Sequence, residues 1–120
     1  PVVTEHRLDI ASQLAEGIEH MHSQRLVHRD LKSSNVGLQS ANSSTSRLRV
    51  KILDLGLAKR LRFSRSALPT GPKDVGTRNW MAPEMFSHLE GVNLEDDLKY
   101  DDVTAKVEVW SFGCILLELL

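Results

Sequence analysis

Residues 104–120 constrain the fold of this chain most, because they predict a helix that is apolar on nearly every side. Such a helix has to be surrounded by protein, since none of its faces suits contact with water. The chain supplies little to cover it besides one amphipathic helix, so we expect this buried helix to need more protein around it than these 120 residues provide. Its apolar residues are Val107, Val109, Trp110, Phe112, Cys114, Ile115, Leu116, Leu117, Leu119 and Leu120.

Residues 5–22 predict the amphipathic helix, because apolar side chains recur there at spacings of three and four. The stripe that this periodicity predicts for the core consists of Leu8, Ala11, Ala15, Ile18 and Met21 or His22, with Leu14 beside it.

A β-hairpin is predicted over residues 36–53. Residues 47–53 alternate apolar and basic side chains, which is the period of a half-buried strand, and residues 36–39 are the natural partner strand. Residues 40–46 between them are almost entirely polar, and we expect them to form an exposed loop.

The overall composition is that of an ordinary globular domain, with 41% hydrophobic and 26% charged residues. Collagen-like and wholly disordered chains are excluded. No apolar run approaches the ~18 residues that a membrane-spanning helix requires, and the first residues lack the layout of a signal peptide. The single cysteine, Cys114, has no partner for an internal disulfide. These features predict a protein of the cytoplasm or nucleus that is not secreted and has no membrane segment in this chain.

The net charge of −1 conceals two runs of opposite sign. Residues 59–78 hold six basic residues and one acidic residue, whereas residues 90–102 hold six acidic residues and one lysine. Each run is compatible with an ordinary solvated loop. Nucleic-acid binding is not predicted for the basic run, because Phe63 is its only aromatic residue before Trp80 and the chain as a whole is not basic.

The densest group of chemically capable residues is at 28–35, which read His-Arg-Asp-Leu-Lys-Ser-Ser-Asn. Further along the chain come Asp-Leu-Gly at 54–56, Gly-Thr at 76–77, Trp-Met-Ala-Pro-Glu at 80–84 and Val-Trp-Ser-Phe-Gly at 109–113. In this order and at these intervals, the motifs resemble those of the eukaryotic protein kinase catalytic domain. The resemblance extends over nearly the whole chain.

This resemblance implies an α+β, protein kinase-like fold, in which residues 1–120 are a partial domain. They would form a mainly helical fragment from the central part of the large lobe, with a short β-hairpin. Residues 28–35 would be the catalytic loop, 54–84 the activation segment and 90–102 an acidic insertion before the buried helix. The glycine-rich loop and strand lysine of the small lobe have no counterpart here. We therefore expect these residues alone to fold weakly, to bind ATP poorly and to show no measurable kinase activity.

The resemblance also implies roles in transfer of the γ-phosphate of Mg-ATP to protein hydroxyls. Asp30 would accept or orient the proton of the substrate hydroxyl, and Lys32 would direct a positive charge at the γ-phosphate. Asn35 and Asp54 would supply oxygen ligands to Mg²⁺. A lysine at position 32 is more typical of serine/threonine kinases than of tyrosine kinases, and residues 76–84 resemble the tyrosine-kinase-like group.

Other positions are expected to support the transfer. Arg29 is typical of kinases whose activation segment is ordered by phosphorylation, which an upstream activating kinase would carry out. Thr77 resembles the family threonine that hydrogen-bonds near the catalytic aspartate. Glu108 stands where the family usually has an aspartate that holds the catalytic-loop backbone. The candidate phosphate acceptors are Ser64, Ser66 and Thr70, and His28, Glu84 and Glu108 would be structural.

An alternative is a pseudokinase or regulatory binding module that keeps the fold without turnover. The presence of Asp30, Lys32, Asn35 and Asp54 favours the enzyme. Leu55 replaces the phenylalanine that usually follows the magnesium-binding aspartate, and we interpret this as altered packing.

Overall fold

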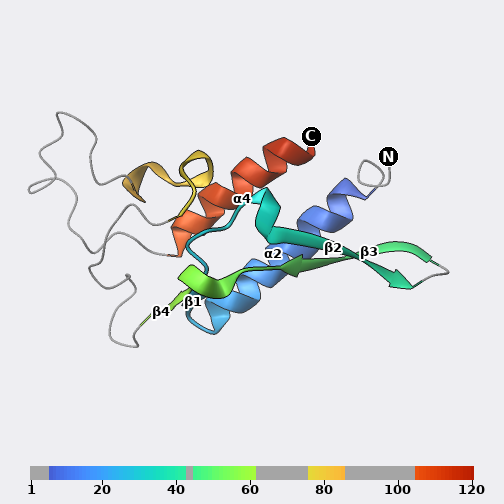
Figure 1. Ribbon diagram of the computed structural model, residues 1–120, viewed down its shortest axis with the longest axis horizontal. Helices are drawn as coiled ribbons and strands as arrows, with labels where there is room; N and C mark the ends of the chain where they lie inside the picture. Colours follow the sequence, from blue (N-terminus) through green and yellow to red (C-terminus); the bar gives the residue numbers. More distant parts are fainter. Residues whose placement is uncertain (1–5, 43–44, 62–75, 86–104) are drawn as a thin grey trace, which may run out of the picture.

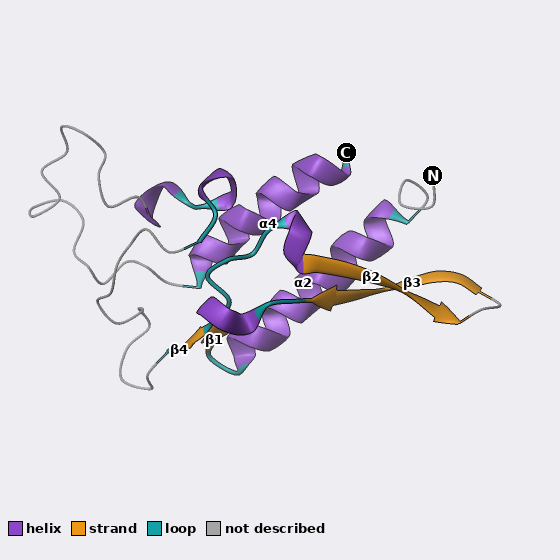
Figure 2. Cartoon of the chain, viewed as in Figure 1, coloured by secondary structure: helices purple, strands orange, loops and turns teal. Residues whose placement is uncertain are grey.

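The computed structural model describes residues 6–42, 45–61, 76–85 and 105–120. Two helices lie on one side of a β-hairpin, and a second, very short strand pair lies near the end of the first helix (Figures 1 and 2). The elements are α2 (Arg7–Ser23), β1 (Leu26–Val27), β2 (Val36–Asn42), β3 (Thr45–Ile52), β4 (Lys59–Arg60) and α4 (Lys106–Leu119). The described residues also contain 3₁₀ turns at Ser33–Asn35, Leu55–Leu57, Arg78–Trp80 and Pro83–Met85.

Helix α2 buries a stripe that only partly matches the predicted one, because Ile18 and its predicted neighbour Leu14 are buried but Leu8 and Ala15 are not. Its buried residues are Ile10, Leu14 and Ile18, whereas Leu8 is 88% exposed and Ala15 is also exposed. A spacing of three and four fits two neighbouring stripes of this helix, and the packing partners decide between them. The helix begins at Arg7 and ends at Ser23, where 5–22 was predicted.

The hairpin lies within the predicted residues 36–53, but its two strands are longer than the sequence indicated. The ladder of β2 and β3 runs from Val36↔Ile52 to Asn42↔Thr45, with an irregularity between Ser40 and Asn42. The expectation of a loop over residues 40–46 was therefore wrong for most of that segment. Backbone hydrogen bonds between antiparallel strands do not depend on apolar side chains, so the ladder continues through a polar sequence.

Helix α4 connects two small cores. Ile115 packs with Leu14, Ile18 and Leu31, and this cluster is flanked by apolar side chains of the hairpin. Val107, which lies near the beginning of the same helix, belongs to the second cluster. The other members of that second cluster are Val27, Leu61, Met81, Ala82 and Met85.

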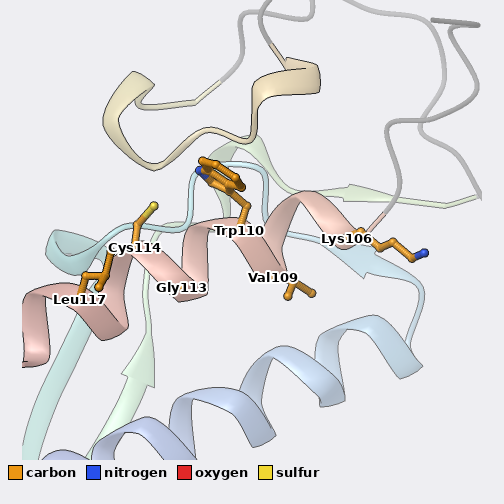
Figure 3. A pocket seen from close by; sticks show the side chains of 6 residues that line it. All are labelled: Lys106, Val109, Trp110, Gly113, Cys114 and Leu117. Atoms are coloured by element: carbon orange, nitrogen blue, oxygen red, sulfur yellow. The ribbon is translucent and has the colours of Figure 1, made fainter.

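One side of α4 is not covered by the described residues. Val109 is 61% exposed, Trp110 50% and Leu117 71%. With Lys106, Gly113 and Cys114 they line a mainly apolar groove of about 720 Å³ (Figure 3). The helix occupies Lys106–Leu119, where 104–120 was predicted, and it contacts the rest of the described chain on one side. Within the described ranges, neither helix combines the length and apolar character that crossing a membrane would need.

Candidate active site

Residues 28–35, which the sequence predicts to be the catalytic loop, lie between β1 and β2, and His28 attaches them to the segment after β3. This side chain is completely buried. Its Nε2 hydrogen-bonds the carbonyl oxygen of Leu53 at 2.8 Å, so Nε2 carries the hydrogen, and its Nδ1 accepts the backbone N–H of Asp30 at 3.2 Å. One imidazole therefore joins the catalytic loop to the residue before Asp54.

The backbone of Arg29 adopts a left-handed conformation, with φ at +68°. Its N–H donates to Oε1 of Glu108 on α4 at 2.9 Å, and its side-chain Nε donates to the carbonyl oxygen of Leu57 at 2.7 Å. Burial lowers the pKa of the Arg29 guanidinium from its ordinary value, because the charged form loses hydration. A left-handed residue costs free energy, and these hydrogen bonds hold it in place.

Asp30, Thr77 and Lys32 form a connected polar triad. Thr77 donates its hydroxyl hydrogen to Asp30 Oδ1 at 2.7 Å, and Lys32 Nζ donates to Thr77 Oγ1 at 2.8 Å. The same ammonium group lies 3.4 Å from Asp30 Oδ2. Asp30 and Thr77 are 47 residues apart in sequence, so this contact attaches the activation segment to the catalytic loop.

Asn35 is 7% exposed and is fixed by its amide group. Nδ2 donates to the carbonyl oxygen of Asp30 at 2.9 Å, which leaves Oδ1 as the oxygen that can serve a cation. The backbone carbonyl of Asn35 accepts the N–H of Leu53 at 2.8 Å. This bond keeps Asn35 next to the residue that precedes Asp54.

Asp54 lies at the start of a 3₁₀ turn in a left-handed conformation, with φ at +59°. Its Oδ1 accepts the N–H of Gly56 at 3.2 Å, while the side chain stays exposed. A carboxylate and an amide oxygen are hard donors of the kind that Mg²⁺ prefers, so the donor set of Asp54 and Asn35 fits this ion.

Several predicted residues are not placed at this site. Ser64, Ser66 and Thr70 lie outside the described residues, as does the acidic run at 90–102. Glu84 belongs to the 3₁₀ turn Pro83–Met85, and its side chain is outside the description.

The structure gives Gly76 and His22 roles at the site that the sequence analysis did not assign to them. Gly76 has φ at +119° and approaches the Arg29 carbonyl so closely that a Cβ would lie 2.6 Å from its oxygen. Its position directly before Thr77 was an available signal. His22 contacts Glu108, which is 86 residues away, and no local pattern indicates such a contact.

Comparisons with known proteins match this chain to one protein family. The family model of the protein kinase domain matches residues 2–120. The serine/threonine-protein kinase CLA4 of Saccharomyces cerevisiae is 37% identical over 111 residues, which are 92% of this chain and 11% of that protein. The alpha subunit of the inhibitor of nuclear factor kappa-B kinase of Xenopus tropicalis is 37% identical over 113 residues, or 94% of this chain and 13% of that protein.

A solved structure has the same fold. The yeast RNA polymerase II CTD kinase CTDK-1 complex aligns with a TM-score of 0.68 and 27% identity, covering 98% of this chain and 31% of the matched chain. The chain thus spans between a tenth and a third of the proteins to which it is compared here. The sequence motifs, the α+β fold and these similarities together show that the chain belongs to the protein kinase domain family.

Proposed function

We propose that this chain carries the catalytic loop of a protein serine/threonine kinase, which transfers the γ-phosphate of ATP to protein hydroxyl groups. The triad of Asp30, Thr77 and Lys32 supports this proposal most strongly. A carboxylate, a hydroxyl and an ammonium group held within hydrogen-bonding distance suit a reaction that depends on positioning and charge stabilisation.

Asp30 is the residue that receives the substrate hydroxyl in this proposal. Thr77 occupies Oδ1 at 2.7 Å, whereas the contacts of Oδ2 with described residues are longer, at 3.4 Å to Lys32 and 3.5 Å to Asn35. Oδ2 is therefore the oxygen that can accept the hydroxyl hydrogen, orient the attacking oxygen and take up its proton as the new bond to phosphorus forms.

Lys32 places its side-chain nitrogen beside the reacting groups. Its ammonium group is anchored to Thr77 Oγ1 and retains further donors for a phosphate oxygen. Exchange of Thr77 for a residue without a hydroxyl would release both Lys32 and Asp30, which explains why a threonine suits this position.

Asn35 and Asp54 would hold Mg²⁺, through Oδ1 of the amide and the exposed carboxylate. A bound Mg²⁺ neutralises charge on the phosphate groups of ATP. Asn35 is held rigidly by Asp30 and Leu53, so its oxygen is positioned before any ligand arrives.

The regulatory proposals concern the activation segment. Arg29 has a partly desolvated guanidinium group, and a phosphate would be a favourable counter-charge for it. Ser64, Ser66 and Thr70 are the candidate acceptors, and an upstream kinase is the proposed source of phosphate. Residues 76–84 support membership of the tyrosine-kinase-like group. The proposed substrates are proteins, and the proposed location is the cytoplasm or nucleus.

The function is tested with Asp30→Asn in the full-length protein that contains this chain. We expect kcat for phosphate transfer to a generic acceptor protein to fall about 100- to 10,000-fold, because the amide cannot accept the proton. The KM for ATP should change little, since Asp30 contacts the acceptor rather than the nucleotide in this proposal.

The control is Glu19→Gln, which removes a negative charge from an exposed position of α2. It should keep the activity of the unmodified protein. If Asp30→Asn retains substantial activity, Asp30 does not have the proposed role. If the unmodified protein binds Mg-ATP without turnover, the pseudokinase alternative is correct.

A further inference from the structure

The buried carboxylate of Glu108 binds two different parts of the chain. Glu108 is 1% exposed and lies in the first turn of α4. Oε1 accepts the N–H of Arg29 at 2.9 Å, and Oε2 lies 2.5 Å from Nε2 of His22, near the end of α2. Glu108 therefore connects α2 to the catalytic loop.

The contact with Arg29 bears directly on the geometry of the site. Arg29 has a left-handed backbone and immediately precedes Asp30. Its N–H is held by Glu108, and its carbonyl oxygen faces the close approach of Gly76. The two contacts hold the peptide groups on either side of the Arg29 Cα, and together these groups set where the next residue, Asp30, begins.

The contact with His22 restrains Glu108, whose flexible side chain would otherwise be a poorly fixed acceptor for the backbone N–H of Arg29. Its side chain has three rotatable bonds, one more than aspartate, so a single hydrogen bond leaves the carboxylate free to turn. A second hydrogen bond from His22 to the other oxygen removes that freedom. It also satisfies an oxygen that burial would otherwise leave without a partner, at considerable cost.

We propose that His22 is a positioning residue for phosphoryl transfer. It acts through Glu108 on the backbone N–H of Arg29 and thereby on the position of Asp30. This inference rests on the proposed kinase function. Nothing in the local sequence around His22 indicates it, because the contact joins residues 86 positions apart. The histidine touches neither substrate nor nucleotide in this proposal, so its effect is on the placement of Asp30.

The test uses His22→Ala and His22→Gln in the full-length protein. With His22→Ala, kcat should fall about 10- to 100-fold, the range expected when a reacting group is displaced slightly, while the KM for ATP stays within about twofold. Glutamine can present an amide N–H to Glu108, so His22→Gln should recover most of the loss. The matched control is His20→Ala, on the exposed side of the same turn.

A second measurement does not depend on turnover. Hydrogen exchange at the Arg29 amide should be faster in His22→Ala than in the unmodified protein and unchanged in His20→Ala. If the unmodified protein has no activity, the proposed function fails, and the exchange rate still decides the role of His22.

A purely structural role gives a different pattern. It would lower the amount of folded protein without changing kcat per folded molecule or exchange at Arg29, and this result would overturn the proposal. If His22→Ala does not fold, His22→Gln is compared with His22→Asn, whose shorter amide does not reach Glu108. Equal kcat values for these two variants would also overturn it.

Discussion

Gly76 lies against the catalytic loop at a distance that leaves no room for a side chain. A Cβ at this position would be 2.6 Å from the carbonyl oxygen of Arg29, and the backbone has φ at +119°. The close approach brings Thr77, the next residue, to its hydrogen bond with Asp30 at 2.7 Å. Gly76, which has no side chain to take part in the reaction, therefore allows Thr77 to reach Asp30 and complete the triad.

In the full-length protein that contains this chain, Gly76→Ala should therefore reduce both stability and activity. The strained φ and the clash with a backbone atom should lower the free energy of unfolding by about 1–3 kcal/mol. Phosphate transfer should fall at least about tenfold, because Thr77 is displaced from Asp30. Chemical denaturation and initial-rate measurements check the two effects.

Gly113→Ala is the matched control for this substitution. Apart from its two chain neighbours and the backbone of its own helix, no described atom lies within 4 Å of a Cβ at Gly113, which is inside α4. Alanine is the better helix former, so this variant should be unchanged or slightly more stable. Equal behaviour of the two alanine variants would contradict the argument for Gly76.

At the scale of elements, Gln13 holds the hairpin against α2. Its Nε2 donates to the carbonyl oxygen of Leu48 at 2.9 Å, and its Oε1 accepts the N–H of Val50 at 3.0 Å. The side-chain amide thus makes the two hydrogen bonds that a neighbouring strand would make to the edge of β3. This contact positions the hairpin, and the segment after it carries Asp54.

In the full-length protein, Gln13→Ala should lower the free energy of unfolding by about 1–2 kcal/mol, because the carbonyl of Leu48 and the N–H of Val50 lose their partner. Gln39→Ala removes the same side chain from an exposed position of β2 and should have little effect. Denaturant titration of both variants, with hydrogen exchange at Val50, makes the comparison. A Gln13→Ala variant as stable as Gln39→Ala would show that packing alone holds the hairpin.

A second connection between elements attaches the 3₁₀ turn Arg78–Trp80 to α4. The hydroxyl of Ser111 donates to the carbonyl oxygen of Trp80 at 2.6 Å, and Nε1 of Trp80 donates to Glu118 at 2.6 Å. Since Thr77 precedes this turn, α4 supports the triad through these bonds and the catalytic loop through Glu108.

At the scale of the whole molecule, the described residues leave an apolar groove on α4 open to water. Val109, Trp110 and Leu117 are at least half exposed within the described structure, although an apolar helix is stable only when covered. A polypeptide of residues 1–120 should therefore associate with itself and bind an apolar dye.

Leu117→Lys should weaken this association, because it places a charge in the groove where the wild-type side chain is 71% exposed. Sedimentation at several concentrations should show a smaller weight-average mass than for the unmodified polypeptide. Ala15→Lys adds the same charge at an exposed position of α2 and should leave the association unchanged. A polypeptide that stays monomeric and binds no dye would refute the role of the groove.

Much of the architecture could be predicted from local patterns. The helices and the hairpin follow from periods of 3.6 and 2 in the apolar residues, and the kinase-like fold follows from the order of the motifs. The buried stripe of α2 could not be predicted, because it depends on contacts with the hairpin and α4. The extension of β2 and β3 was missed because a backbone ladder can form in a polar sequence.

The sequence by itself determined which chemical groups the candidate site has, because the members of each motif, at 28–35 and at 54–56, are neighbours along the chain. Only the tertiary structure decided how they are arranged. Thr77 reaches Asp30 across 47 residues, Glu108 reaches Arg29 across 79, and His22 meets Glu108 across 86. Such contacts depend on how α2, α4 and the activation segment pack together, and periodicity along one segment contains no information about the distance to another.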